Sequence, residues 1–229
     1  MTEFAGIPKS LPAFLAELAE NNSREWFAEN RDRFQTLAVG PCLALIDALA
    51  PKLAAMNPPH KAIAATNRSL RRIYRDTRFS KDKTPYYTYL HLIFWAGDHP
   101  MRSPGLHVVF TAGGLGLGAG LWGFDKQTLR RYREAIADGG KRKALGDALQ
   151  QARQAGCHLE APVLKRVPAG LEVPQEAEKL ARQKGIVVRN RNEAYDDAVF
   201  SSNCVDYLIG RLEPLCGVDR WLMGHVFAD

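Results

Sequence analysis

The chain has 229 residues, of which 46% are hydrophobic and 24% are charged, and its formal net charge is +6 with a pI near 9.2. These proportions are typical of a globular protein with a sizeable core, and they exclude a disordered charged tail. The positive excess favours an acidic or phosphorylated partner. We find no signal peptide and no apolar run of membrane-spanning length, so we expect a cytoplasmic protein.

Residues 1–57 carry a helical pattern. Phe14, Leu15 and Leu18 repeat at helical spacing after Ser10, which we expect to cap the first helix. Ser23 is the expected cap of a second helix, and Pro41 starts or kinks a third. The adjacent prolines at 58 and 59 then mark a linker.

Residues 62–122 carry the signal of a sheet. Residues 87–95 and 106–111 are rich in aromatic and branched side chains, and the interval 97–105 between them is typical of a loop joining paired strands. From Gly113 to Gly120 glycine alternates with larger residues, so a strand here has one face of bare backbone. Either a close neighbour, such as a helix or a ligand, or a strong twist would explain that face.

Residues 125–229 are mainly helical by pattern, with helices expected over 125–137, 142–155, 174–184 and 196–216. An extended piece is expected over 157–167, and 186–188 can form a strand. Because the strands cluster instead of alternating with helices, the sequence predicts one α+β domain over residues 1–229. Its mostly antiparallel sheet would be flanked by an N-terminal helical segment and by C-terminal helices.

The segment from Arg68 to Tyr86 is the most charged part of the chain. Its seven cations are accompanied by only two carboxylates, those of Asp76 and Asp82, and it also carries several apolar residues. We therefore expect a folded, positively charged surface that binds an anion. The ligand-binding residues predicted here are Arg72, Arg75, Arg78, Ser80, Lys81, Lys83 and Tyr86. Asp76 and Asp82 are the candidate catalytic acid or base. The alternative is that both carboxylates neutralise neighbouring arginines in a structural loop.

Three residues outside this segment complete the predicted site. Trp122 is flanked by glycine and can stack on a base, and Lys165 and Arg166 can add charge if they converge on the arginines. The string from Gly118 to Gly123 matches GxGxxG, but no second parallel strand follows it to build a dinucleotide-binding unit.

His91 and His107 lie on the two predicted strands that flank the 97–105 loop. A strand pairing centred near His99 sets them opposite each other. Two imidazoles alone make a poor metal site, and the isolated cysteines form no CxxC pair, so the sequence identifies no metal and no cofactor.

Four motifs taken together resemble one family. They are Arg75-Asp-Thr-Arg-Phe-Ser-Lys-Asp-Lys-Thr-Pro-Tyr86, Asn21-Asn-Ser-Arg-Glu-Trp-Phe27 with Asn30-Arg31, Gly120-Leu-Trp122 and Leu164-Lys-Arg-Val-Pro168. In this combination they resemble the family catalogued as domain of unknown function 2461, over nearly the whole chain. The resemblance implies a single domain of this family and carries no biochemical role. The chain departs from the family pattern at Phe124, where a proline is usual, and at Ala169, where a basic residue is usual.

The sequence therefore predicts a cationic cleft that binds a phosphate-bearing small ligand, either a nucleotide or a phosphorylated metabolite. An enzyme would use the same cations to stabilise charge that develops during group transfer, and the sequence does not decide between binding and turnover. Two alternatives stay open. One is a nucleic-acid-binding module, for which a basic stripe with interleaved aromatics is expected, and the other is a structural or partner-binding protein with internally paired arginines.

Overall fold

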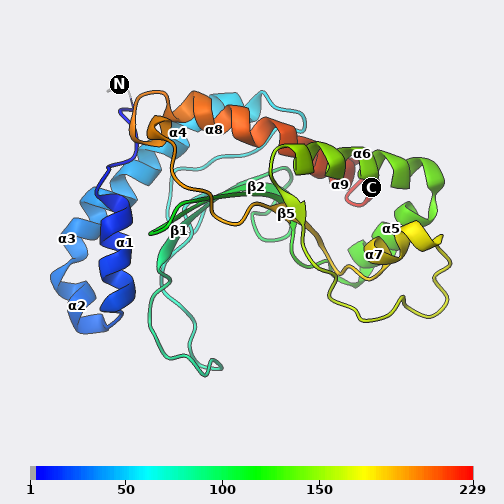
Figure 1. Ribbon diagram of the computed structural model, residues 1–229, viewed down its shortest axis with the longest axis horizontal. Coiled ribbons are helices and arrows are strands. Elements are labelled where there is room, and N and C mark those ends of the chain that lie inside the picture. The colour runs from blue at the N-terminus through cyan, green and yellow to red at the C-terminus, as the bar shows by residue number, and fades with distance from the viewer. Residues whose placement is uncertain (1–3, 229) are drawn as a thin grey trace.

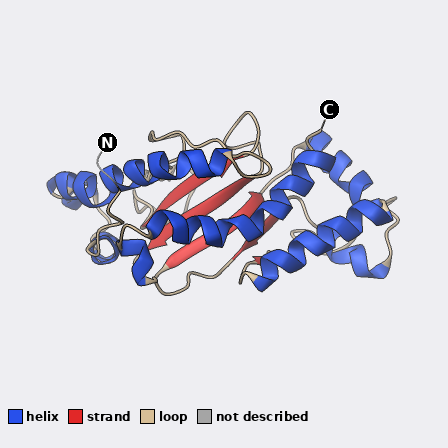
Figure 2. Ribbon diagram, turned by 90° about the horizontal axis from the view of Figure 1, so that it is seen from above, coloured by secondary structure: helices blue, strands red, loops and turns tan. Residues whose placement is uncertain are grey.

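Residues 4–228 are described by a computed structural model, in which a five-stranded antiparallel sheet carries helices on one face (Figure 1, Figure 2). The strand order is β1-β2-β3-β5-β4. The strands are β1 (Tyr89–Trp95), β2 (Gly105–Thr111), β3 (Leu115–Leu121), β4 (His158–Leu159) and β5 (Ile186–Arg189). An N-terminal helical segment and C-terminal helices accompany the sheet, which confirms the predicted α+β class.

The sheet forms where the sequence places its strands. β1 and β2 match the two predicted strands, and β3 is the glycine-rich stretch. β5 and the two-residue β4 come from the mainly helical third of the chain. β5 pairs with β3, and β4 pairs with the other edge of β5. The sheet thus extends beyond residues 62–122, because the chain returns to it after the fifth and sixth helices.

The helix-facing side of the sheet follows from the period of two in a strand. Every second residue is apolar and buried, and this set comprises Leu90, Leu92, Phe94, Leu106, Val108, Phe110, Leu115, Leu117, Ala119, Ile186 and Val188. The covering helices are α4 (Gly40–Ala54), α8 (Cys204–Leu212) and α9 (Cys216–His225), and Figure 2 shows helices crossing the strands from above. α6 (Gly139–Gln154) packs against α9 and β4 at the far end of this layer.

The N-terminal helices descend beside the sheet (Figure 1, blue). They are α1 (Leu11–Glu20), α2 (Arg24–Glu29), α3 (Arg31–Phe34) and the π-helical turn η1 (Gln35–Val39). Ser23 caps α2 as predicted, because its hydroxyl accepts the Trp26 N–H at 3.2 Å. The prediction for Ser10 is wrong: it precedes α1, but its side chain makes no capping hydrogen bond.

The helical run Arg31–Ala54 is long and apolar enough to cross a membrane by length and composition alone, which differs from the sequence-based expectation. Its buried stripe, however, packs inside the protein. Leu45, Ile46, Leu49 and Leu53 are fully buried, and α4 contacts both α8 and β1. One such helix is weak evidence for a membrane span, and this burial is the packing of a core helix.

In the C-terminal third, the helices predicted over 125–137 and 142–155 form close to their predicted bounds, whereas the other two are shortened or interrupted. Asp125 and Asp138 cap α5 (Lys126–Ala137) and α6 through their carboxylates. The predicted helix over 174–184 is reduced to η2 (Gln175–Ala177) and α7 (Glu178–Ala181). It stops there because the chain must turn into β5 at Gly185, where an added Cβ would lie 2.3 Å from the Trp122 carbonyl oxygen.

The predicted helix over 196–216 is also interrupted. Asp196 caps the short η3 (Asp197–Phe200), and α8 begins only at Cys204. The turn η4 (Glu213–Leu215) contains Pro214 and separates α8 from α9. Since proline provides no N–H for the preceding helix, this break lies where a backbone donor is missing.

Candidate ligand-binding cleft

Within residues 4–228, no second layer of helices covers the other face of the sheet (Figure 1). Two adjacent cavities of about 500 and 370 Å³ lie on it and share Tyr89, His91, His107 and Trp122. Two segments project on either side of it, residues 71–88 and residues 160–174 (Figure 1). This concave face, which we call the cleft, is where the chain brings polar and aromatic side chains together.

The alternating glycines of β3 face the cleft. Gly116 and Gly118 line the smaller cavity and Gly120 lines the larger one. Their close neighbour is the adjacent strand β5 and the chain beyond it, not a helix. A Cβ on Gly118 would lie 2.7 Å from the Val188 oxygen, and Gly120 has a φ of +114° that favours glycine. The bare strand therefore leaves room in the cleft and allows β5 to approach.

Two histidines meet at the centre of the cleft. The strand register pairs His91 with Val109 and Ile93 with His107, so the histidines are diagonal neighbours and not directly opposite as expected. The pairing is centred at position 100 and not at His99. Diagonal residues still share a face, and His91 Nε2 lies 2.8 Å from His107 Nδ1.

We assign the tautomers of this pair from their neighbours. The Gly120 backbone raises the pKa of His107, as an accepting carbonyl does, so we assign the ring proton of neutral His107 to Nε2. His107 Nδ1 must then accept from His91 Nε2–H, which leaves His91 Nδ1 as a free acceptor. No described residue bonds that atom, and it is not among the buried unpaired atoms.

Both histidines are neutral at pH 7. Burial, together with the charged form of His107 and the Arg71 guanidinium, lowers the pKa of His91 to about 3. Burial likewise lowers the pKa of His107, although the Asp219 carboxylate and the Gly120 bond oppose the shift. The centre of the cleft is thus a neutral hydrogen-bonding site.

Arg71 and Arg72 supply positive charge at the cleft wall. Both line the larger cavity. The Arg71 N–H donates to the His91 carbonyl at 2.9 Å, and the flanking bridge between Leu70 and Leu92 sets Arg71 opposite His91. Among residues 4–228, neither guanidinium forms an ion pair or a side-chain hydrogen bond. Sequence reasoning included Arg72 but missed Arg71, for which the alternation of apolar and charged residues at 70–73 was the available signal.

Aromatic rings line the same cleft. The Trp122 side chain is 57% exposed, and the Arg189 guanidinium lies 5.3 Å from its ring centroid while also bonding Glu160. Tyr87 and Tyr89 pack together with centroids 5.1 Å apart on the opposite wall. The cleft therefore combines planar apolar surfaces with cations, as a site for a charged ligand with a ring requires.

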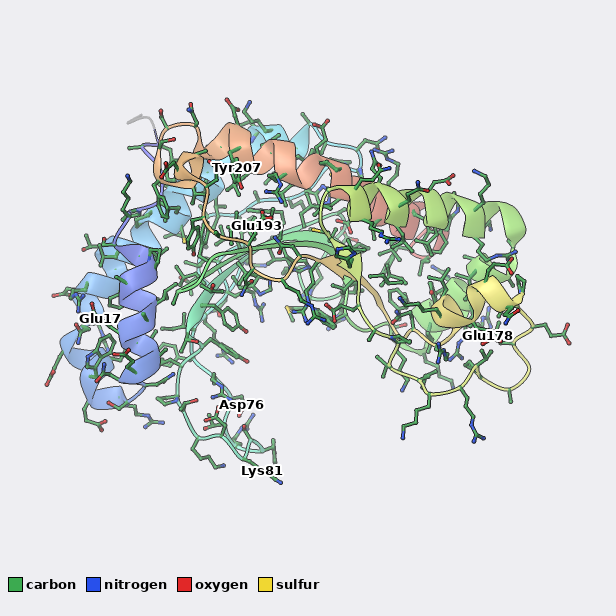
Figure 3. All side chains as sticks on the ribbon, in the orientation of Figure 1. Glu17, Asp76, Lys81, Glu178, Glu193 and Tyr207 are labelled. Carbon is green, nitrogen blue, oxygen red and sulfur yellow. The ribbon has the colours of Figure 1, made fainter. Side chains whose placement is uncertain are left out.

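The predicted cations at 75–83 lie outside the cleft, on a hairpin that projects from it. We call residues 75–85 the hairpin; Figure 3 labels Asp76 partway along it and Lys81 near its tip. Arg75 bonds Asp82 at 2.5 Å and also Thr84, and Arg78 binds both oxygens of Asp76 at 3.0 and 2.7 Å. Each predicted carboxylate thus pairs with one predicted arginine.

The remaining hairpin residues have different surroundings. The Lys83 ammonium donates to the Thr77 carbonyl at 2.9 Å, and Ser80 closes the turn through its backbone bond to Thr77. Lys81 is exposed and has no hydrogen bond or ion pair with the described residues. Bonds from Arg78 lower the pKa of Asp76 to about 2, and bonds from Thr84 and Arg75 lower the pKa of Asp82 to about 2. Both carboxylates are therefore ionised at neutral pH and hold the hairpin together.

Tyr86 lies at the base of the hairpin and belongs to the core. It is 5% exposed, its ring stacks on Phe27 with centroids 4.3 Å apart, and Asn22 bonds both its backbone N–H and its carbonyl. Lys165 and Arg166 are exposed on the 160–174 segment and line neither cavity of the cleft. The structure therefore does not bring them together with Arg75 and Arg78.

The GxGxxG string does not form a dinucleotide loop. It runs from the end of β3 into the turn before α5, and the strand that returns beside β3 is the antiparallel β5. The Asp125 carboxylate already accepts the Thr128 N–H at the start of α5. Among the described residues, no group of three histidine, cysteine, aspartate or glutamate side chains is placed to hold a metal ion.

The fold and cleft define an α+β domain with a helix-covered sheet whose second face is open. A family model described as conserved hypothetical protein (DUF2461) matches residues 10–221. The chain belongs to this family. No curated protein and no solved structure matches the chain.

Proposed function

We propose that the cleft binds a small phosphate-bearing ligand with a planar ring, for which a nucleotide is the best chemical fit. The observation that carries this proposal is the position of Arg71 and Arg72 in the same cavity as Trp122, where neither arginine forms an ion pair with residues 4–228 and Asp76 is paired with Arg78. Guanidinium groups match phosphate oxygens, and the exposed indole offers a stacking surface. The neutral His91 Nδ1 adds an acceptor for a ligand hydroxyl or amino group.

The proposal moves the anion contact from the hairpin to the cleft wall. Arg75 and Arg78 are already neutralised by Asp82 and Asp76, so a phosphate would have to displace existing ion pairs to reach them. Arg71 and Arg72 need no such exchange. Carboxylates with a pKa of about 2 are also poor proton donors at neutral pH, which favours a scaffold role for Asp76 and Asp82 over acid catalysis.

A thermal-shift titration tests the proposal. Nucleoside monophosphates, the corresponding nucleosides and inorganic phosphate are compared at two salt concentrations. A monophosphate at a hundred times its Kd would raise the Tm by about 5–10 °C. A nucleoside or phosphate alone would give less, because each makes only half of the contacts.

The matched variants are Arg71→Gln in the cleft and Arg153→Gln on α6, where Arg153 is exposed and has no ion pair among the described residues. Losing a charged hydrogen bond to the phosphate should weaken binding about 10- to 100-fold for Arg71→Gln and leave Arg153→Gln unchanged. Equal shifts from monophosphate and nucleoside, or full binding by Arg71→Gln, would overturn the proposed site.

A further inference from the structure

The tip of the hairpin exposes an aromatic ring that the small-ligand site does not use. The Phe79 side chain is 94% exposed, and the Arg78 guanidinium lies 5.7 Å from its ring centroid. Figure 3 shows the neighbouring Lys81 at the end of the hairpin, away from the sheet. A phenyl ring so fully in water has no role in the core, and it adds an apolar contact surface to the positively charged tip of the hairpin.

The hairpin presents this ring on a braced support. Arg75 ties its two arms together through Asp82 and Thr84, Arg78 is held by Asp76, and the Lys83 ammonium bonds the Thr77 carbonyl. A braced arm loses little conformational entropy when it binds. Lys81 and Lys83 have no carboxylate partner in the described chain, so the tip also keeps positive charge.

Exposed aromatic residues lie both on the hairpin and in the cleft. Among residues 4–228 the exposed aromatic side chains are Tyr74, Phe79, Tyr87 and Trp122. Tyr74, Tyr87 and Trp122 line the larger cavity, and Asp76 of the hairpin lines it too. Exposed rings thus occur in the cleft, where Arg71 and Arg72 supply positive charge, and at the tip of the hairpin, where Lys81 and Lys83 supply it.

We propose that the ligand of the cleft is a segment of single-stranded nucleic acid, with one nucleotide in the cleft and another base of the same strand stacked on Phe79. This inference rests on the proposed function, because the cleft nucleotide uses the same contacts. Rings that stack on successive bases, next to cations that follow the phosphates, are the arrangement of single-strand binding sites. An acidic peptide or an anionic lipid head group supplies the charge but no series of planar rings.

The experiment measures the Kd of a fluorescein-labelled 12-nucleotide oligothymidylate by anisotropy, with thymidine monophosphate followed in parallel by thermal shift. Phe79→Ala should weaken oligonucleotide binding about 5- to 150-fold and leave the monophosphate shift unchanged. Phe79→Trp, which keeps an aromatic ring at this position, should bind the oligonucleotide as the natural chain does. The matched control is Val163→Ala on the opposite segment, where Val163 is 64% exposed and carries no ring.

Salt provides a second readout. Release of counterions by about four phosphate contacts predicts that log Kobs falls with log salt with a slope of about −3. Full oligonucleotide binding by Phe79→Ala, together with a monophosphate shift that Arg71→Gln abolishes, would overturn this inference and leave the proposed function standing. If thymidine monophosphate does not raise the Tm at all, both the proposed function and this inference are wrong. Equal affinity for a duplex of the same length or for polyglutamate would overturn the single-strand assignment.

Discussion

Acidification should destabilise the protein through the histidine pair of the cleft. The pKa of His91 is about 3 in the folded chain against an ordinary value of 6.5. Between these values the unfolded chain binds a proton that the folded chain excludes. The contribution of His91 to the free energy of unfolding is therefore fully present above pH 6.5 and is lost as the pH falls. One such group lowers the free energy of unfolding by about 1.4 kcal/mol for each pH unit below 6.5, which amounts to about 2 kcal/mol at pH 5.

The charges around the pair act in known directions. Arg71 opposes protonation of both histidines, whereas the Asp219 carboxylate favours protonation of His107. Because His107 shares the hydrogen bond with His91, the pair takes up its first proton as a unit. The pKa of about 3 for His91 includes repulsion from a charged His107, so it describes the second proton taken up by the pair.

The assay is urea unfolding followed by circular dichroism at pH 5.0 to 7.5, with His91→Gln as the test variant. The Gln amide can still donate to His107 Nδ1, but it cannot titrate. We expect its free energy of unfolding to fall by about 2 kcal/mol less than that of the natural chain between pH 6.5 and 5. His158→Gln, at an exposed position on β4, serves as the control. The same pH slope in His91→Gln and the natural chain would refute the reasoning.

Two further substitutions test the cleft floor and the hairpin. Gly120→Ala should lower the free energy of unfolding by about 3 kcal/mol or more, because its φ is +114° and the new Cβ would lie 1.9 Å from the Ile186 oxygen. Gly123→Ala, with no atom within 4 Å, should be nearly neutral in the same urea titration, and equal stability of the two variants would contradict the account. Asp82→Asn should speed tryptic cleavage within the hairpin several-fold without changing global unfolding, since it weakens the Arg75 and Thr84 bonds. Asp98→Asn, at a fully exposed carboxylate, is the control, and unchanged cleavage in Asp82→Asn would show that the hairpin is held by other contacts.

The strands were the most predictable part of the fold. The branched and aromatic residues of β1 and β2 and the alternating glycines of β3 each encode a period of two, which local sequence displays directly. The register was less predictable. The pairing centre lies at position 100 because the loop closes through the Ala96 N–H to Pro104 carbonyl bond, and a one-residue difference in such a loop leaves no sequence signal.

Helix ends in the last third were harder to predict for a tertiary reason. The segment before β5 has helical periodicity, but the helix must end before Gly185, where the backbone packs against the Trp122 carbonyl. That contact joins residues more than sixty positions apart. Local periodicity contains no information about it, so the predicted helix extended too far.

Only some of the predicted site residues lie in the cleft, and other cleft residues were not predicted. Arg72, Asp76 and Trp122 line the larger cavity, as a site on this segment would require. Arg71 and the histidine pair also line it, but their approach depends on sheet register and on the pairing of Leu70 with Leu92. Charge density in the sequence shows how many cations are present, and only the fold shows which of them face the cleft.

The two interpretations that the sequence left open for residues 68–86 apply to different side chains. Asp76 and Asp82 neutralise Arg78 and Arg75, which is the structural-loop interpretation for the hairpin arms. The anion-binding proposal then depends on Arg71 and Arg72 in the cleft wall, which form no ion pair with these carboxylates, although the charge of Arg72 lowers the pKa of Asp76. The two roles should therefore separate by mutation: a change at Asp82 acts on protease sensitivity, whereas a change at Arg71 acts on ligand affinity. A variant set in which both changes moved the same property would mean that hairpin and cleft are one structural unit.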